Sequence, residues 1–356
     1  NFFKELPGGP KGATGLEANM VGLHLADDLG VWCNYGQLQR DFIKLYHDGV
    51  IEKKLGAREY KSYSWGKYDK GDPSFLFELL PRIAGKVGEL GTALGLGTGH
   101  LLERWNLSEE TWRKDKKLGY WKLGHPKHHA SDEVGQCGLL VNLIYNRDAV
   151  CHSHSNFTRN GLPLPIQKRL AADIWGAPEA VDGIGDFKPM HRSKARMAKW
   201  SLLRKELHDS LSLCNWMGPW AASPLRERGY SGDDSMESML YSLATGDRKN
   251  REELDAVAER IFLLHRALTI RGMGTKEMRT RHDTIPEWVY TDKSGKAPFT
   301  KGAVHMDRKD VQVALDMFYD ELGLDRATGA PTRATYRKFG LNDVADELAK
   351  TKLVPA

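Results

Sequence analysis

Apolar residues recur at the spacing of one helix face in four segments of the chain. The positions that define these predicted helices are Leu254, Val257, Ile261, Leu264 and Leu268; Val311, Leu315, Phe318 and Leu322; Trp200, Leu203, Leu207 and Leu211; and Leu38, Phe42 and Leu45. Signals for helix ends agree with this pattern. Asp307 is placed as an N-cap and Gly323 as a terminator of the second segment, while Gly218-Pro219 and Gly49 follow the third and fourth.

Alternation typical of strands is scarce, so the pattern predicts a mainly α fold. The best strand candidate is the apolar run from Gly138 to Tyr145, which a buried helix explains equally well. A chain of 356 residues is long for one domain and favours two. Residues 106–135 are polar and rich in Trp, Lys and His, so we place the boundary there and expect helical domains over residues 1–123 and 124–356.

Composition narrows the classes of partner and compartment. Fifty-two basic and 47 acidic side chains leave a net charge of +5, which is too small to favour a nucleic-acid or membrane-surface partner. No apolar stretch approaches the roughly 18 residues of a transmembrane helix, so we expect no membrane span. The four cysteines, at positions 33, 137, 151 and 214, match neither a disulfide framework nor a zinc pattern. We therefore expect a reducing, cytoplasmic setting.

Two segments place an aspartate near the end of a predicted helix and a cysteine shortly after it. Asp27 shares a helix face with Met20 and Leu23, and Gly30 is positioned to end that helix before Cys33. A carboxylate in the last helical turn is disfavoured by the helix dipole by roughly 0.3–1 kcal/mol. A heterocycle with adjacent N–H donors, such as a pterin, would offset this cost through charge-assisted hydrogen bonds. The alternative is an ordinary helix end with a buried thiol.

The second segment repeats the arrangement, with Asp209 near a helix end followed by Leu213, Cys214 and Asn215. Because the arrangement recurs within one chain, the ligand-binding interpretation and the ordinary helix end stand as equal alternatives. Cys33 also precedes the next predicted helix, a position that lowers a thiol pKa and favours the thiolate, the form that binds soft metals.

Three further segments carry weaker signals. His152 and His154 form a His-x-His pair beside Cys151, which suits either a metal-proximal site or a hydrogen-bonded surface pair. The stretch from Thr275 to Glu287 follows a long helix and contains Asp-x-x-Pro, so it predicts a structured loop. The glycines of residues 95–99 lack the Lys-Ser/Thr of a phosphate-binding loop, and they give no ground for nucleotide binding.

The two aspartate segments, the His-x-His segment and the late loop together resemble domains 2 and 3 of the aldehyde ferredoxin oxidoreductase family of tungsten enzymes. Residues 27–32 are similar to the family's first Asp-x-x-Gly-Leu-Asp motif, with Trp32 where Asp is usual. Residues 209–214 are similar to the second motif, with Ser212 in place of Gly. The resemblance implies a tungsten bis-pterin cofactor with one pterin on each motif. The cofactor-binding residues that it implies are Asp27, Gly30, Val31, Trp32, His154, Asp209, Leu213 and Asn215.

The resemblance also implies a [4Fe–4S] cluster, for which Cys214 would be the fourth ligand, and a catalytic His152 beside the metal. The family's sheet-rich, pterin-binding N-terminal domain has no counterpart in this sequence. We therefore expect that part to come from the same polypeptide or from a partner chain. A ferredoxin or an iron–sulfur subunit is the implied electron-transfer partner.

Cys33 favours one branch of the family. The class II benzoyl-CoA reductase catalytic subunit uses a cysteine thiolate as a tungsten ligand, whereas the aldehyde-oxidising members have no protein ligand on tungsten. The position of Cys33 directly after the first motif resembles the former, which implies reduction of an aromatic acyl-CoA with His152 as the proton donor. Two alternatives remain open: oxidation of an aldehyde to a carboxylate with ferredoxin as acceptor, and a non-catalytic helical subunit without metal.

Overall fold

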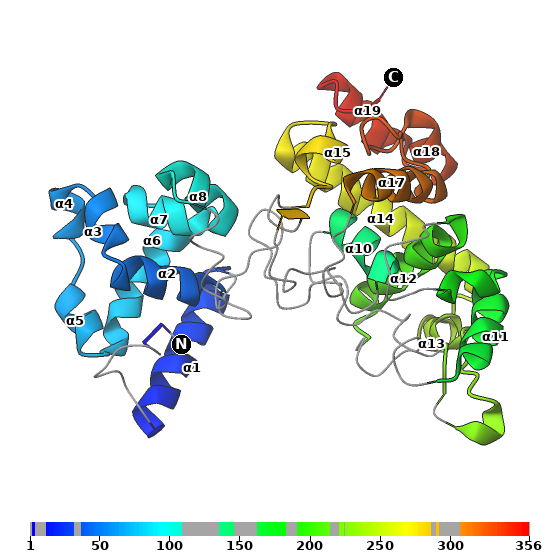
Figure 1. Cartoon of the computed structure of the whole chain (residues 1–356), viewed down its shortest axis with the longest axis horizontal. Coiled ribbons are helices and arrows are strands. Elements are labelled where there is room, and N and C mark those ends of the chain that lie inside the picture. The colour runs from blue at the N-terminus through cyan, green and yellow to red at the C-terminus, as the bar shows by residue number, and fades with distance from the viewer. Residues whose placement is uncertain are drawn as a thin grey trace. The chain divides into compact units, whose positions relative to one another are not determined.

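The computed structural model of the chain describes residues 2–3, 12–31, 37–108, 135–145, 162–182, 191–213, 221–223, 225–285, 290–291 and 307–355. These residues form two compact units, Asn1–His128 and His129–Ala356, which are considered separately (Figure 1). The expected boundary near residue 124 lies outside the described residues, so the division into 1–123 and 124–356 stays a prediction.

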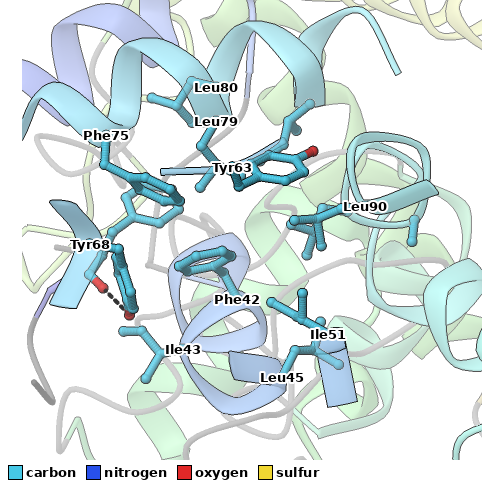
Figure 2. Close-up of a cluster of buried hydrophobic side chains, with 14 of the residues drawn as sticks. Phe42, Ile43, Leu45, Ile51, Tyr63, Tyr68, Phe75, Leu79, Leu80 and Leu90 are labelled. Atoms are coloured by element: carbon cyan, nitrogen blue, oxygen red, sulfur yellow. Dashed lines mark hydrogen bonds between the residues drawn. The ribbon is translucent and has the colours of Figure 1, made fainter. Parts of the chain in front are cut away.

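Helices make up the first unit throughout its described part. They are α1 (Gly12–Asp28), α2 (Gln37–His47), α3 (Val50–Lys54), α4 (Ala57–Tyr60), α5 (Trp65–Asp69), the 3-10 turn η2 (Pro73–Phe75), α6 (Leu76–Ala84), α7 (Gly88–Gly95) and α8 (Thr98–Trp105). The core is aromatic at its centre (Figure 2). The ring of Phe42 meets that of Tyr68 edge-on at 5.1 Å, and the Tyr68 hydroxyl donates to the carbonyl of Phe2 at 3.1 Å. The expected helix through Leu38 and Leu45 is thus confirmed as α2.

The glycine-rich stretch of residues 95–99 has a packing role. A Cβ on Gly95 would lie 2.6 Å from the carbonyl oxygen of Ile83, so only glycine lets α7 approach the end of α6 this closely. Gly97, with φ 85°, then turns the chain into α8. This close packing explains the glycines without a bound phosphate.

The second unit is also helical in its described part. Its elements are α10 (Gly135–Ile144), α11 (Leu164–Trp175), η6 (Pro178–Val181), α12 (Arg192–Ser210), η7 (Arg226–Arg228), α13 (Met236–Thr245), α14 (Arg251–Met273), α15 (Met278–Arg281), α17 (Arg308–Leu322), α18 (Arg333–Lys338) and α19 (Asn342–Lys350). Helix α12 is central and packs against α10, α14 and α17 (Figure 1). The mainly α fold is therefore confirmed, and the apolar run ending at Tyr145 is helix α10 rather than a strand.

Helix α17 matches its prediction in register and at both ends. Val311, Leu315, Phe318 and Leu322 are buried, and the Asp307 side chain accepts from the amide of Lys309 at 2.8 Å. Gly323 closes the helix in the left-handed conformation.

Helix α14 exists as predicted and Leu254 on the expected face is buried, but the buried side extends beyond that face. Leu268 is 58% exposed, while the buried face runs through Ala258, Phe262, Arg266 and Ile270. Arg266 belongs to this buried side through its ion pair with Asp283, which an apolar pattern does not register. The third predicted helix, α12, ends at Ser210, before Gly218-Pro219, which lies outside the described residues.

Within the described segments, no helix combines the length and apolar character needed to cross a bilayer.

Candidate functional site: two matching helix ends

The first aspartate motif forms the C-terminal end of α1. The Val31 amide donates to the carbonyl of Ala26 at 2.8 Å, and the Gly30 amide donates to the carbonyl of Asp27 at 3.0 Å. Gly30 adopts φ 65°, so this end is a Schellman motif with glycine in the left-handed position. The prediction that Gly30 ends the helix is confirmed, and Asp27 is the second-to-last helical residue.

The second aspartate motif repeats this backbone at the end of α12. The Leu213 amide donates to the carbonyl of His208 at 2.9 Å, which is the same six-residue closure. Ser212 takes the place of Gly30 with φ 56°, although it carries a side chain. Asp209 is again the second-to-last helical residue. The two motifs therefore share the six-residue closure and the left-handed position, which Ser212 occupies in place of glycine.

The surroundings of the two carboxylates differ. Asp27 is exposed and shares an exposed face of α1 with Met20 and Leu23, which are 62% and 42% exposed. The side chain of Asp209 is only 25% exposed. Its Oδ1 accepts from the Lys205 ammonium and its Oδ2 from the Tyr145 hydroxyl, both at 2.9 Å. Among the described residues, side chains donate hydrogen bonds to the carboxylate of Asp209 but not to that of Asp27.

Buried charged side chains anchor the last turns of α12 from inside the unit. His208, fully buried, lies 3.0 Å from Oε1 of Glu237 through its Nε2 atom. Arg204 forms ion pairs with Glu237, at 3.7 Å, and with Asp255. Burial lowers the pKa of Arg204, because its charge loses hydration, and the carboxylates of Glu237 and Asp234 oppose this shift in part. These buried contacts hold the last turns of α12, and with them the second motif, against the rest of the unit.

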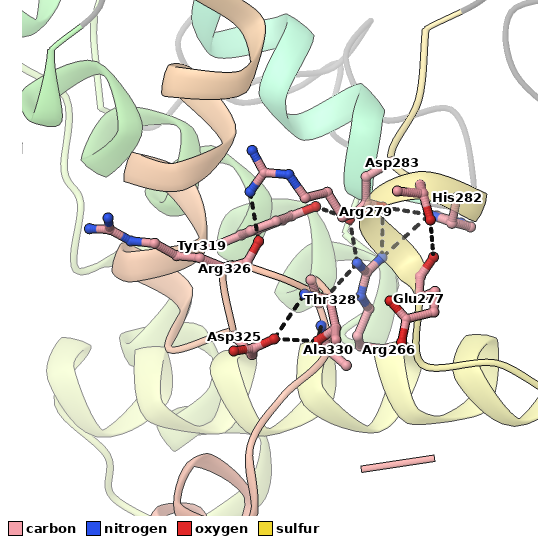
Figure 3. Close-up of polar contacts among 12 residues, drawn as sticks. Arg266, Glu277, Arg279, His282, Asp283, Tyr319, Asp325, Arg326, Thr328 and Ala330 are labelled. Atoms are coloured by element: carbon pink, nitrogen blue, oxygen red, sulfur yellow. Dashed lines mark hydrogen bonds and ion pairs between the residues drawn. The ribbon is translucent and has the colours of Figure 1, made fainter. Parts of the chain in front are cut away.

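The late loop that follows α14 is built around a fully buried carboxylate (Figure 3). Asp283 receives a two-pronged ion pair from Arg266, with one contact of 2.9 Å, and a hydrogen bond from the Tyr319 hydroxyl at 2.6 Å. Arg266 also donates to the carbonyl of Gly329 at 2.8 Å. Burial and the adjacent Asp283 raise the pKa of Tyr319. These contacts join α14, α17 and the loop, so the predicted structured loop is confirmed as far as residue 285 and its aspartate is structural.

The predicted site residues divide into two groups. Those within the described residues are Asp27, Gly30 and Val31 in the first unit and Asp209 and Leu213 in the second. Those outside the described residues, whose roles stay predictions, are Trp32, Cys33, His152, His154, Cys214 and Asn215. In the part of the chain that the structure describes, no three His, Cys, Asp or Glu residues are grouped to hold a metal ion.

Sequence reasoning missed Lys205 and Tyr145. Lys205 precedes Asp209 by four residues, the spacing of an ion pair on one helix, so its role was readable. Tyr145 is 64 residues away in sequence, and no local signal links it to Asp209.

The family model described as aldehyde ferredoxin oxidoreductase, domains 2 & 3, matches residues 7–341. The chain belongs to the aldehyde ferredoxin oxidoreductase family. Among solved structures, this family member is similar to the active-site complex BamBC of benzoyl coenzyme A reductase in complex with 1,5-dienoyl-CoA, with 17% identity and a TM-score of 0.52. The match covers 98% of this chain and 51% of that one, so the chain spans about half the length of this neighbour. At this identity the likeness shows a shared fold.

Proposed function

We propose that this chain forms the two helical domains of a tungsten bis-pterin, [4Fe–4S] oxidoreductase that reduces the ring of an aromatic acyl-CoA. The observation that carries the proposal is the repeated helix end. Each unit contributes one Schellman motif with an aspartate at the same position, at Asp27 and at Asp209. A cofactor with two chemically equivalent halves is the simplest ligand for two equivalent motifs.

The residues of the two helix ends fit a pterin. A carboxylate accepts two parallel N–H donors of a heterocycle, and the negative end of the helix dipole strengthens the attraction for such donors. In each motif the left-handed residue, Gly30 or Ser212, ends the helix three residues after the carboxylate. The residues proposed to hold the pterins are Asp27, Gly30, Val31, Trp32, His154, Asp209, Leu213 and Asn215.

The metal ligands are proposed to follow directly from these turns. Val31 is tied to Ala26 two residues before Cys33, and Leu213 is tied to His208 one residue before Cys214. We assign Cys33 to tungsten and Cys214 to the [4Fe–4S] cluster, because thiolates are the ligands that both soft centres prefer. When bound, this cofactor pair supplies low-potential electrons. His152 would supply one of the two protons that a two-electron ring reduction requires, acting as a general acid.

The remaining parts of the enzyme are proposed as partners. A sheet-rich, pterin-binding part from the same or a partner chain completes the cofactor site, and a ferredoxin or iron–sulfur subunit delivers electrons. The acyl-CoA substrate is supported by the structural neighbour, whose complex contains 1,5-dienoyl-CoA. A cytoplasmic location is proposed because the four cysteines of the sequence do not match a disulfide framework.

Aldehyde oxidation is the second candidate, because the matching family model is described by that activity. The experiment compares benzoyl-CoA reduction with benzaldehyde oxidation in the intact purified assembly. Ring reduction is the expected result, and benzaldehyde oxidation alone would overturn the substrate assignment. A preparation with neither tungsten nor iron would favour a non-catalytic helical subunit instead.

Cys33 has its own test. X-ray absorption at the tungsten edge should show one sulfur neighbour fewer in Cys33→Ala than in the unmodified enzyme. An unchanged number of sulfur neighbours would overturn the tungsten assignment of Cys33.

A further inference from the structure

Within the described part of the second unit, each oxygen of the Asp209 carboxylate accepts a hydrogen bond from a side chain. Lys205 comes from the preceding turn of α12, and Tyr145 follows the last residue of α10. An aspartate side chain turns freely about its last bond, so a single hydrogen bond leaves the carboxylate plane undetermined. Two donors, one on α12 and one just after α10, fix that plane. A carboxylate offers about four acceptor positions, so two hydrogen bonds do not by themselves exhaust them.

Both donors are themselves constrained. The side chain of Lys205 is 6% exposed and Tyr145 is 4% exposed, so neither is free to sample solvent conformations. The Tyr145 ring meets the His265 ring nearly perpendicularly at 5.4 Å, and His265 lies 3.0 Å from a Glu206 oxygen through its Nδ1 atom. The donors are therefore ordered before any ligand arrives, and ligand binding does not have to pay this ordering cost.

The first motif supplies an internal comparison. Leu23 occupies the position four residues before Asp27 that Lys205 occupies before Asp209, and its side chain is 42% exposed. Because the backbones of the two helix ends match, the difference between the motifs lies in these side chains rather than in the turn.

We propose that Lys205 and Tyr145 are positioning residues that orient the Asp209 carboxylate for one pterin, so that the second motif is preformed. This inference rests on the proposed function, in which Asp209 binds a pterin. A charge-assisted hydrogen bond contributes enough to change a dissociation rate by about tenfold, and a neutral one changes it by a few-fold.

The test follows cofactor loss from the intact holoenzyme in mild denaturant, measured as tungsten and pterin released over time. Lys205→Met should lose cofactor about tenfold faster and Tyr145→Phe a few-fold faster, with Lys205→Arg close to the unmodified enzyme. Lys199→Met is the matched control. Lys199 lies on α12 away from the motif, and the substitution removes its 2.9 Å ion pair with Glu259 of α14. Its rate should not change.

Hydrogen exchange at the Leu213 amide separates positioning from a structural effect. Protection of this amide should be unchanged in Lys205→Met, because the turn does not depend on the lysine. Faster cofactor loss accompanied by an equal loss of Leu213 protection would overturn the inference, as would failure of Lys205→Arg to restore the rate.

Asp209→Asn distinguishes the inference from the function on which it rests. If this variant keeps its cofactor as firmly as the unmodified enzyme, the pterin role of Asp209 is wrong. If Asp209→Asn loses cofactor but Lys205→Met and Tyr145→Phe do not, the positioning role is wrong and the pterin role stands.

Discussion

The left-handed residue in each motif leads to a pair of substitutions with opposite expected signs. Gly30→Ala forces a side chain into φ 65°, whereas Ser212→Gly removes one from φ 56°. A Cβ at Gly30 would meet nothing within 4 Å, so the cost of the first change is purely that of backbone conformation. The left-handed conformation costs a non-glycine residue about 1–2 kcal/mol.

The unfolded chain offsets part of this cost. Removing a glycine stabilises a protein by about 0.4–1 kcal/mol through the lower entropy of the unfolded state. The net expectation is a local destabilisation of about 0.5–1 kcal/mol for Gly30→Ala and a stabilisation of similar size for Ser212→Gly. About 1.4 kcal/mol corresponds to a tenfold change in an equilibrium. The first motif should therefore open two- to fivefold more often in Gly30→Ala, and the second motif two- to fivefold less often in Ser212→Gly.

Native-state hydrogen exchange of two amides provides the assay. The Val31 amide reports on the first turn and the Leu213 amide on the second, because each closes its motif. Gly66→Ala is a suitable control, since this exposed glycine of α5 has open space around it and lacks a positive φ. It should leave both amides unchanged. Shifts of the same sign in Gly30→Ala and Ser212→Gly would refute the argument from the matching turns.

Two further predictions concern the second unit. Asp283→Asn leaves Arg266 as a buried, poorly paired charge and should lower the free energy of unfolding, measured by chemical denaturation, by about 3–5 kcal/mol. Tyr319→Phe removes one hydrogen bond to Asp283 and should lower it by about 1–3 kcal/mol in the same experiment. Hydrogen bonds from Arg326 and then Arg192 lower the pKa of Asp320 from 3.8 to about 2. The stabilising contribution of Asp320 should be complete above pH 4 and disappear as the pH falls through about 2. In Asp320→Asn, the free energy of unfolding should depend less on pH over that window.

Helix α17 shows what the sequence determines by itself. Its apolar spacing, its Asp307 cap and its terminal Gly323 are all local signals, and the structure uses each of them. Helix α14 shows the opposite case. Its buried side includes Arg266, which is paired with Asp283 17 residues away, so hydrophobic spacing alone identified only part of that side.

The candidate site divides in the same way. The placement of Asp27 and Asp209 near helix ends followed from local patterns, as did the terminating role of Gly30. The left-handed turn at Ser212 was hidden, because serine carries none of the conformational preference that makes glycine a recognisable terminator. The contact from Tyr145 depends on the packing of α10 against α12, which no short-range pattern encodes.

The central claim is that the two matching helix ends each hold one pterin of a shared tungsten cofactor. The most direct test is to determine tungsten and pterin together in the intact assembly purified under anoxic conditions. The account predicts two pterins for each tungsten atom and one tungsten atom for each copy of this chain. A single pterin for each metal atom, or a preparation with no pterin at all, would contradict it.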